Sequence, residues 1–278
     1  MDAEVVDGID DDGIARLIAS IYRHYHYDFR HYAATSLRRR LQLAVTRLHC
    51  ASLDELHARV LSDPELFRNL LDYLTVQVSE MFRDPGYFLA LRREVLPVLA
   101  TYPSIRIWVA GCSTGEEAYS FAILLHEEGL LARSQIYATD INARALQSAE
   151  AGIYDIARIA DFSRNHQRSG ARHSLSDYYA TGYGNAVFDR SLRRHMVFSD
   201  HSLATDSVFS EVQLVSCRNV MIYFDRVLQD RAIGLFADSL CQRGFLGLGA
   251  RETLRFSAHA SRFAEASRAE RIYQKQGA

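Results

Sequence analysis

Two glycines in one short segment are the first residues whose type and spacing suggest chemistry. Gly111 and Gly115 lie in WVAGCSTGEEAYS, and the apolar run IRIWVA that begins at Ile105 leads directly into this segment. A glycine at the carboxyl end of a strand lets the backbone approach a cofactor closely, and ligands of open α/β sheets bind at that edge. The spacing fits neither GxGxxG nor GxxxxGKS/T, so the dinucleotide fingerprint and the P-loop are excluded. A cofactor loop and an ordinary strand-to-helix turn remain as alternatives.

An acid at the end of the next strand-like run favours the cofactor loop. Asp140 closes the run QIYATD, 25 residues after Gly115. A carboxylate in this place can accept hydrogen bonds from both hydroxyls of a ribose. The alternative role for Asp140 is to cap a helix that starts at NARALQ.

The elements that position these residues follow from the spacing of apolar side chains. From Asp11 to about Leu74, apolar residues recur every three or four positions, which predicts a row of short amphipathic helices. Ser52 and the pair Asp63-Pro64 are expected to begin two of them. The first quarter of the chain is therefore predicted to be all-helical.

Beyond Ile105, strand-like runs alternate with helical stretches. VQLVSC, a helix from Asp225 to Gln242, and GFLGLG (Gly244 to Gly249) continue this pattern. The alternation predicts an α/β fold with a doubly wound sheet. The predicted domains are a small all-helical N-terminal domain (1–75), a connecting helix or linker (76–103), and an α/β domain (104–278) with a small β-subdomain inserted at about 155–199.

Composition excludes several classes of protein. The 278 residues are 48% hydrophobic and 24% charged, which excludes disorder, collagen and a membrane-spanning channel. Because 32 basic residues face 34 acidic ones, for a net charge of -2, there is no overall positive field to attract nucleic acid or an anionic membrane. All but one of the basic residues are arginine, the exception being Lys275. This bias fits codon usage and, as an alternative, an acidic partner.

Cysteine usage and the N-terminus predict the compartment. Cys50, Cys112, Cys217 and Cys241 are far apart and form no CxxC pair, so we expect reduced thiols, no disulfide framework and no metal site. The segment MDAEVVDGIDDD carries six acids and no basic residue, unlike a secretory signal. No uncharged apolar run approaches the ~20 residues of a membrane span. These features predict a cytoplasmic protein.

Four ordered motifs now add a family resemblance. VQVSEMFRDPGYF (Val76 to Phe88), WVAGCSTGEEAYSFAI, ATDIN and VSCRNVMIYF (Val215 to Phe224) closely resemble the CheR family of chemoreceptor glutamate methyltransferases. The resemblance covers nearly the whole chain, including the helical TSLRRRL segment. It implies an S-adenosylmethionine-dependent methyltransferase, with a Rossmann-like catalytic domain behind the helical one and S-adenosylhomocysteine as product.

The resemblance also implies roles for individual residues. Asp140 matches the ribose-binding acid, Glu117 a contact to the cofactor's ammonium group, and Arg83 the arginine near its carboxylate and methyl. Ser79 and Met81 replace the threonine and first phenylalanine of the family's TxFFR, and Ser202 replaces an asparagine near the adenine. The cofactor-binding residues implied in this way are Gln77, Ser79, Arg83, Gly111, Glu117, Asp140, Ser202, Leu203, Cys217 and Arg218.

The implied reaction is an in-line attack on the methyl carbon by a glutamate carboxylate. A carboxylate with an ordinary pKa of about 4.3 is ionised at pH 7, so no general base is needed. We expect Arg83 and Tyr223 to orient the reacting groups and Arg218 to shape the pocket. The helix bearing Arg38, Arg39, Arg40 and Arg47 is expected to present a cationic face to the acidic, cytoplasmic helical region of chemoreceptors, with a solvated helix face as the alternative.

Further expectations concern partners and rival functions. The stretch from Tyr178 to Phe198 is short for a loop that grips a receptor tail peptide, which favours a tether-independent enzyme. We expect a monomer that neither binds nucleic acid nor inserts into a membrane. The alternatives are a non-catalytic regulatory module that binds S-adenosylmethionine and an NAD-type oxidoreductase, although the latter requires a tighter glycine fingerprint than GCSTGEE.

Overall fold

The computed structural model describes residues 9–277 and divides the chain into two compact units. The first unit contains the described residues up to Gln77 together with Ser202–Asp206 and Tyr223–Ala232. The second contains Val78–His201, Ser207–Ile222 and the chain from Ile233 onward. Most of the predicted acidic N-terminal segment lies outside the described residues. The domain boundaries at 75 and 103 remain predictions, and the sequence pattern did not suggest that two later segments belong with the N-terminal helices.

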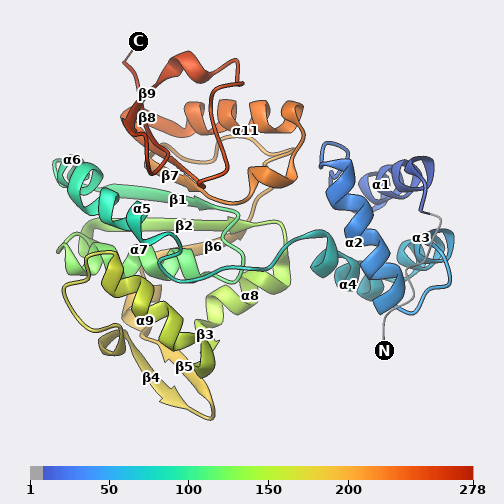
Figure 1. The fold of residues 1–278 in the computed structure, drawn as a ribbon, viewed down its shortest axis with the longest axis horizontal. Helices are drawn as coiled ribbons and strands as arrows, with labels where there is room; N and C mark the ends of the chain where they lie inside the picture. Colours follow the sequence, from blue (N-terminus) through green and yellow to red (C-terminus); the bar gives the residue numbers. More distant parts are fainter. Residues whose placement is uncertain (1–8, 278) are drawn as a thin grey trace. The chain divides into compact units, whose positions relative to one another are not determined.

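Four short helices build the first unit, as their apolar spacing predicts (Figure 1). Side chains at Asp10, Ser52 and Asp63 accept hydrogen bonds from backbone N–H groups in the first turns of three of them. The predicted starts at Ser52 and Asp63-Pro64 are therefore confirmed. The helices are α1 (Asp11–Tyr25), α2 (Ala34–Arg47), α3 (Leu53–Ser62) and α4 (Pro64–Leu74).

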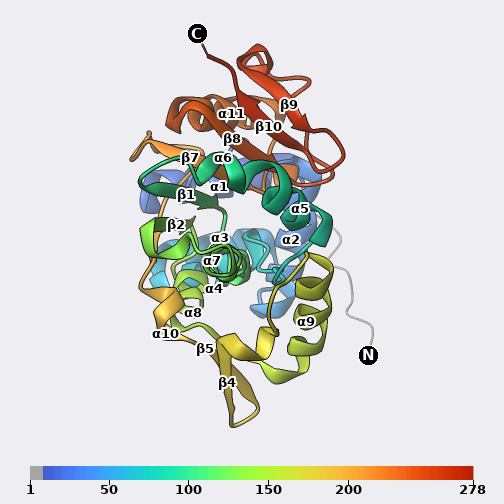
Figure 2. The ribbon, with the colours of Figure 1, turned by 90° about the vertical axis from the view of Figure 1, so that its left-hand side faces the viewer.

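A seven-stranded sheet forms the centre of the second unit, and its strand order is β6-β2-β1-β7-β8-β10-β9 (Figures 1 and 2). The first five strands are parallel, and β10 and β9 are antiparallel additions. The sheet contains β1 (Ile105–Ala110), β2 (Ser134–Asp140), β6 (Met196–Asp200), β7 (Val212–Cys217), β8 (Leu240–Leu248), β9 (Phe263–Ser267) and β10 (Ile272–Lys275). The predicted α/β fold is confirmed.

Helices connect these strands, and α7 and α8 pack against β2. The helical run α5 (Pro85–Ala90), η1 (Leu91–Val95) and α6 (Leu96–Leu99) precedes the first strand. The connections between strands include α7 (Glu116–Glu127), η2 (Leu131–Arg133), α8 (Ala143–Ala151), η5 (Met221–Tyr223), α11 (Arg226–Ser239) and η6 (Ala260–Arg262). The helix predicted to reach Gln242 ends three residues earlier, because Leu240 already pairs with Val212 as the first residue of β8.

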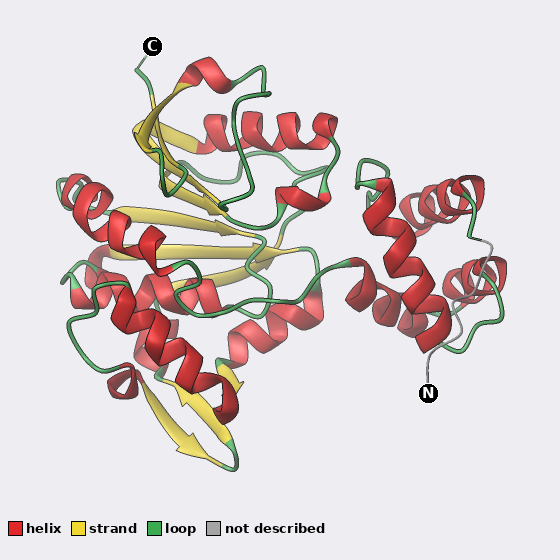
Figure 3. Ribbon diagram, in the orientation of Figure 1, coloured by secondary structure: helices red, strands yellow, loops and turns green. Residues whose placement is uncertain are grey.

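Along the chain between β2 and β6, a second, antiparallel sheet forms with strand order β3-β5-β4; it is labelled in Figure 1, and its strands are yellow in Figure 3. The insertion was predicted, but its helix α9 was not. Phe162 and His166 of α9 are buried, so its inner face belongs to the core of the unit. The inserted elements are β3 (Ile153–Asp155), η3 (Ile156–Arg158), α9 (Ile159–Arg168), η4 (Leu175–Tyr178), β4 (Tyr179–Gly182), β5 (Asn185–Phe188) and α10 (Arg190–Arg193).

Within residues 9–277, no helix combines the length and the apolar composition needed to cross a bilayer.

Candidate active site

The turn after β1 is tightly folded at the carboxyl edge of the sheet. Gly111 and Gly115 have positive φ angles of 72° and 93°, which favour glycine because it lacks a Cβ atom. The N–H groups of Gly111 and Cys112 donate to the Thr139 carbonyl at 2.8 and 2.9 Å, which ties the turn to the end of β2. A Cβ atom at Gly111 would overlap the side chain of Val220. The turn therefore lies between the ends of β2 and β7, where ligands of such sheets bind.

Asp140 lies at the end of β2 and faces this turn. Its Oδ2 accepts a hydrogen bond from the Ser113 N–H at 2.9 Å, and its Oδ1 accepts one from the Asn142 N–H at 3.0 Å. Burial raises the pKa of Asp140, while these backbone N–H groups act in the opposite direction. The cap of α8 is Asn142, whose side chain accepts from the N–H groups of the first turn. The helix-cap alternative for Asp140 is therefore wrong.

Glu117, in the first turn of α7, points toward the end of β7. Its Oε1 accepts a hydrogen bond from the Ser216 hydroxyl at 2.7 Å, and its Oε2 pairs with Arg218 at 2.9 Å. The Glu117 side chain retains 14% exposure. A carboxylate has about four lone-pair sites, so each oxygen can accept one further hydrogen bond.

The neighbouring acid, Glu116, has a different role that the sequence pattern did not show. Its side chain is completely buried, pairs with Arg158 at 2.8 Å and accepts from the Thr114 hydroxyl at 2.7 Å. Arg158 also donates to the Ser79 carbonyl. Glu116 and Arg158 thus attach the segment around Ser79 to the start of α7. This ion pair could not be predicted, because its partners are 42 residues apart.

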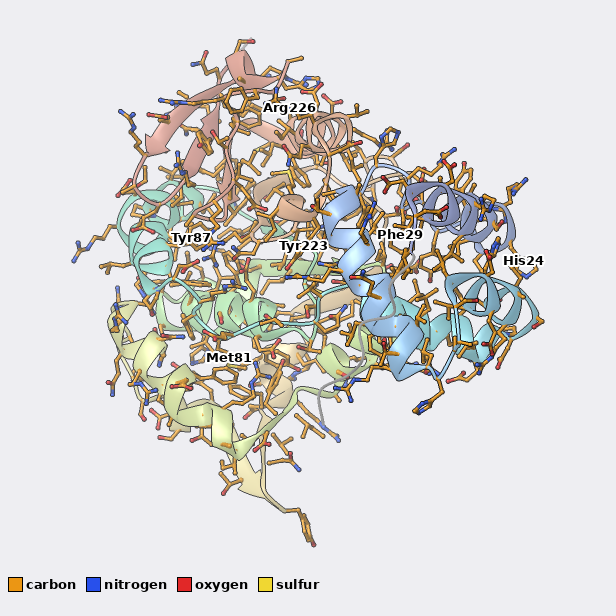
Figure 4. All side chains as sticks on the ribbon, turned by 45° about the vertical axis from the view of Figure 1, so that its right-hand side comes forward. His24, Phe29, Met81, Tyr87, Tyr223 and Arg226 are labelled. Atoms are coloured by element: carbon orange, nitrogen blue, oxygen red, sulfur yellow. The ribbon has the colours of Figure 1, made fainter. Side chains whose placement is uncertain are left out.

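Arg218 is the central connector of the site. Its guanidinium pairs with Glu117, donates to the Arg83 carbonyl at 2.9 Å and pairs with Asp84 at 2.7 Å. It also lies 4.2 Å from the ring centroid of Tyr87, which is labelled in Figure 4. Burial alone would lower the pKa of Arg218, but the neighbouring carboxylates and Tyr87 raise it above its ordinary value. With 1% side-chain exposure, Arg218 joins segments of the protein to one another, and its side chain is almost closed to solvent.

A second connector is Glu252, which the sequence pattern did not indicate. Its carboxylate accepts hydrogen bonds from the N–H groups of Asn219, Val220 and Gly249 at 2.6 to 3.0 Å. Burial raises the pKa of Glu252, whereas the backbone N–H groups lower it. Asn219 has a positive φ of 60°, so the loop after β7 takes a conformation that this carboxylate stabilises. Only an acid shortly after an apolar strand marks Glu252 in the sequence.

The predicted site residues fall into both units. Arg83 is partly exposed, and its Nη1 donates a long hydrogen bond of 3.5 Å to the Val78 carbonyl. Cys217 is completely buried in β7, and burial raises its thiol pKa, so its predicted cofactor contact lacks structural support. The second unit holds Ser79, Arg83, Gly111, Glu117, Asp140, Cys217 and Arg218, and the first holds Gln77, Ser202, Leu203 and Tyr223.

The residues of the first unit have local roles. The Ser202 N–H donates to Asp206, and the Ser202 hydroxyl accepts from the Ala204 N–H, so Ser202 begins a turn. Leu203 is buried in the same turn. The Gln77 amide donates to the Thr75 hydroxyl at 2.9 Å.

The expected cationic face of α2 needs correction. Arg40 is only 5% exposed, lies 4.3 Å from the ring centroid of Tyr223 and donates to the Leu74 carbonyl. Burial lowers its pKa. Arg40 is therefore a packing partner of Tyr223 and does not lie on a docking face with Arg47. Arg38 forms an exposed ion pair with Asp11, while Arg39 and Arg47 are exposed.

The parallel sheet, with Asp140 at the end of β2 and Glu117 in the first turn of α7, defines a Rossmann-like α/β protein. Residues 77–270 match the CheR methyltransferase SAM binding domain, and residues 12–75 match the CheR methyltransferase all-alpha domain. The chain belongs to the CheR methyltransferase family, and S-adenosylmethionine is its cofactor.

Named relatives cover most of the chain. The chain is 55% identical to the "Putative methyltransferase Cher3" of Pseudomonas putida, over 94% of this chain and 96% of the relative. It is 32% identical to the "Chemotaxis protein methyltransferase" of Vibrio parahaemolyticus, over 78% and 80% of the two chains. It is 28% identical to the protein of the same name from Listeria innocua, over 84% and 87%.

The residues present fit this cofactor. The Asp140 carboxylate keeps lone pairs for ribose hydroxyls, and Glu117 keeps them for an ammonium group. Asp140 is 9% exposed and the Glu117 side chain is 14% exposed, so both carboxylates are largely shielded from water. This shielding strengthens their hydrogen bonds to a cation or a hydroxyl.

Proposed function

We propose that this enzyme transfers a methyl group from S-adenosylmethionine to glutamate side chains of methyl-accepting chemotaxis proteins. The products are a glutamyl methyl ester and S-adenosylhomocysteine, and the process is adaptation in chemotaxis-type signalling. The support is the name that the Vibrio and Listeria relatives carry, "Chemotaxis protein methyltransferase", together with the MFRDP segment that Arg218 holds beside Glu117. We also propose that the enzyme is cytoplasmic and monomeric.

Methyl transfer to a carboxylate requires little general acid–base catalysis from the protein. The cofactor's sulfonium supplies an electrophilic methyl group, and the attacking glutamate carboxylate is already ionised at pH 7. Burial raises the pKa of the thiols of Cys112 and Cys217, which keeps both neutral and makes neither a nucleophile. The contribution of the chain is therefore to position the reactants and exclude water.

Arg83 and Tyr223 are the residues that we propose orient the reacting groups. Among residues 9–277, the Arg83 guanidinium makes only a long hydrogen bond to a carbonyl, and it is partly exposed, so it is available to a carboxylate. The Arg218 contact to the Arg83 carbonyl fixes the backbone at that position. Tyr223 is partly exposed, and the Arg40 guanidinium over its ring fixes the plane of the phenol.

A stripe on α2 is the part of the cationic face that we retain for receptor docking. Arg39, Leu43 and Arg47 are spaced four residues apart, so they share one face of the helix. All three are exposed, with Leu43 at 48%. An apolar residue with one cation on each side suits an acidic, amphipathic receptor helix. Arg38 flanks this stripe.

The decisive experiment uses tritiated S-adenosylmethionine and receptor-bearing membranes, followed by alkaline release of methanol. A carboxyl ester releases volatile label under alkali, whereas label on nitrogen or sulfur is retained. Arg83→Ala and Tyr223→Phe are expected to lower turnover by about tenfold or more at saturating cofactor, with S-adenosylhomocysteine affinity measured alongside. Arg164→Ala, an exposed partner of Asp161, is the control.

Each result separates the candidate functions. Base-stable label would refute a glutamyl ester, and full turnover in both variants would refute their roles. Binding of S-adenosylhomocysteine without any methyl transfer would instead indicate a regulatory module.

A further inference from the structure

A cleft of about 460 Å³ opens near the C-terminal end of the second unit, between the turn after β8 and the turn between β9 and β10. Pockets for small molecules have volumes of about 300 to 1,000 Å³, so the cleft is large enough for a ligand of nucleotide size. One side carries Thr253, Arg255 and Phe256, and the other carries Arg268 and Arg271.

The cleft concentrates positive charge. Within residues 9–277, no carboxylate forms an ion pair with Arg255 or Arg271, and Arg268 has only a distant contact, 4.0 Å, to the exposed Glu265. Three guanidinium groups around one opening repel each other unless an anion lies between them. Guanidinium groups bind phosphate through paired N–H donors, which makes phosphate the anion that best fits their geometry.

An aromatic side chain lines the same cleft. Phe256 is 75% exposed, a large value for a phenylalanine. A planar ring in a ligand can stack on such a side chain, and base–aromatic stacking adds affinity whatever the base. An arginine cluster alone fits any small anion, whereas arginines and an aromatic ring together fit a nucleotide.

We propose that this cleft binds a nucleoside diphosphate, with Arg255, Arg268 and Arg271 on the diphosphate and Phe256 against the base. A nucleoside diphosphate has about three negative charges above pH 7, which matches three arginines. The cleft shares no residue with the methyl-transfer site, which includes Asp140 and Glu117. The proposal does not depend on the methylation substrate.

The surrounding contacts decide which residues a test should leave intact. Glu252, next to Thr253, holds the backbone of Asn219 and Val220. Glu270 lies between Arg268 and Arg271 in the sequence, and its carboxylate packs against Gly86, where a Cβ atom would overlap it. Substituting either acid would disturb the methyl-transfer site, so the test is confined to the arginines and Phe256.

The test is isothermal titration calorimetry of the full chain with guanosine diphosphate, inorganic pyrophosphate and guanosine. Saturating S-adenosylhomocysteine is present to fill the cofactor site. We expect guanosine diphosphate to bind the wild type, and Arg255→Ala/Arg271→Ala to weaken it by about tenfold or more. Phe256→Ala should weaken guanosine diphosphate but leave pyrophosphate affinity unchanged. Arg251→Ala is the control, because Arg251 is exposed on the same turn but does not line the cleft.

Thermal unfolding and S-adenosylhomocysteine affinity, measured for every variant, verify that each is folded. The proposal is overturned if guanosine diphosphate gives no binding up to millimolar concentration, or if the arginine double variant and the wild type bind it equally. Equal losses in Phe256→Ala for guanosine diphosphate and pyrophosphate, or equal affinities of the wild type for both, would also overturn the nucleotide assignment. Unchanged S-adenosylhomocysteine affinity in the variants separates this result from any failure of the methyltransferase itself.

Discussion

Arg218 joins two motifs that lie far apart along the chain. It contacts the Arg83 carbonyl, 135 residues away, and pairs with Asp84 and Glu117. The family resemblance implies that Arg218 binds the cofactor and shapes its pocket. In the structure, the Arg218 guanidinium is buried and bound to protein groups. The Arg83 guanidinium is the more exposed of the two.

This network predicts a large loss of stability when Arg218 is removed. Arg218→Ala leaves Glu117 and Asp84 without their cation; loss of the largely buried Arg218–Glu117 pair should cost about 3 to 5 kcal/mol, and loss of the pair with the half-exposed Asp84 should add little. Arg218→Lys keeps the charge but not the planar fork, so part of the loss should remain. Urea unfolding at pH 7 measures both, with Arg164→Ala expected to change stability by less than about 0.5 kcal/mol. If Arg218→Ala is as stable as Arg164→Ala, the connecting role of Arg218 is refuted.

At the scale of elements, one buried carboxylate holds four segments of the second unit together. Glu127 at the end of α7 accepts from His166 of α9 at 3.0 Å and from Tyr178 of η4 at 3.3 Å, and it pairs with Arg92 of η1. Burial would raise the pKa of Glu127, but hydrogen bonds from His166 and Arg92 lower it to about 2. Glu127 is therefore ionised in the folded protein well below its ordinary pKa of 4.5.

A pH-dependent prediction follows from this shift. Because the folded-state pKa of Glu127 is lowered, its ionisation stabilises the fold fully above about pH 4.5, and this stabilisation is lost as the pH falls toward 2. Glu127→Gln should cost about 3 to 5 kcal/mol at pH 7. The difference between wild type and variant should shrink between pH 4.5 and pH 3, as measured by urea unfolding at pH 7, 4.5 and 3. A difference that stays constant over this range would show that the carboxylate does not titrate as described.

Helix α2 carries the prediction about receptor recognition. Charge reversal at Arg39 and Arg47 places two acids opposite an acidic receptor helix, so receptor methylation should fall by about tenfold at low salt, and less at high salt. S-adenosylhomocysteine affinity should not change, because neither residue was implied in cofactor binding. Arg23→Glu, on the exposed end of α1, is a matched control. Methylation that is insensitive to the double reversal would leave α2 as a solvated face.

At the scale of the whole molecule, the sequence predicted the parts that depend on local pattern. Apolar spacing predicted the four N-terminal helices, and the alternation of strands and helices predicted the parallel sheet. The position of Asp140 at the end of a strand-like run predicted its role, and the motif resemblance added Glu117. The roles of Glu252, Glu116 and Arg40 could not be predicted, because each depends on a partner brought close only by folding.

The first unit combines segments that lie far apart along the chain. The segment Tyr223–Ala232 belongs to this unit although it lies late in the chain. The Ala33 N–H donates to the Tyr223 carbonyl at 2.9 Å, the Asp225 N–H donates to the His31 carbonyl at 2.8 Å, and Phe224 packs on Tyr32 with ring centroids 5.0 Å apart. A fragment of residues 78–278 would keep this segment but lose all of these partners.

The fragment should therefore fail to behave as an independent enzyme. Exposing Phe224 and leaving backbone groups without partners should produce binding of a hydrophobic dye and lower the unfolding temperature by several degrees or more. Tyr32→Ala in the full chain leaves the two backbone hydrogen bonds in place but removes the ring contacts to Phe224 and Phe29, and it should cost about 1 to 3 kcal/mol. Because Tyr223 loses Arg40, the fragment should also lack methyl transfer even when it binds S-adenosylhomocysteine. A fragment as stable and active as the full chain would show that the late segment needs no N-terminal partner, and the first unit would then serve receptor docking alone.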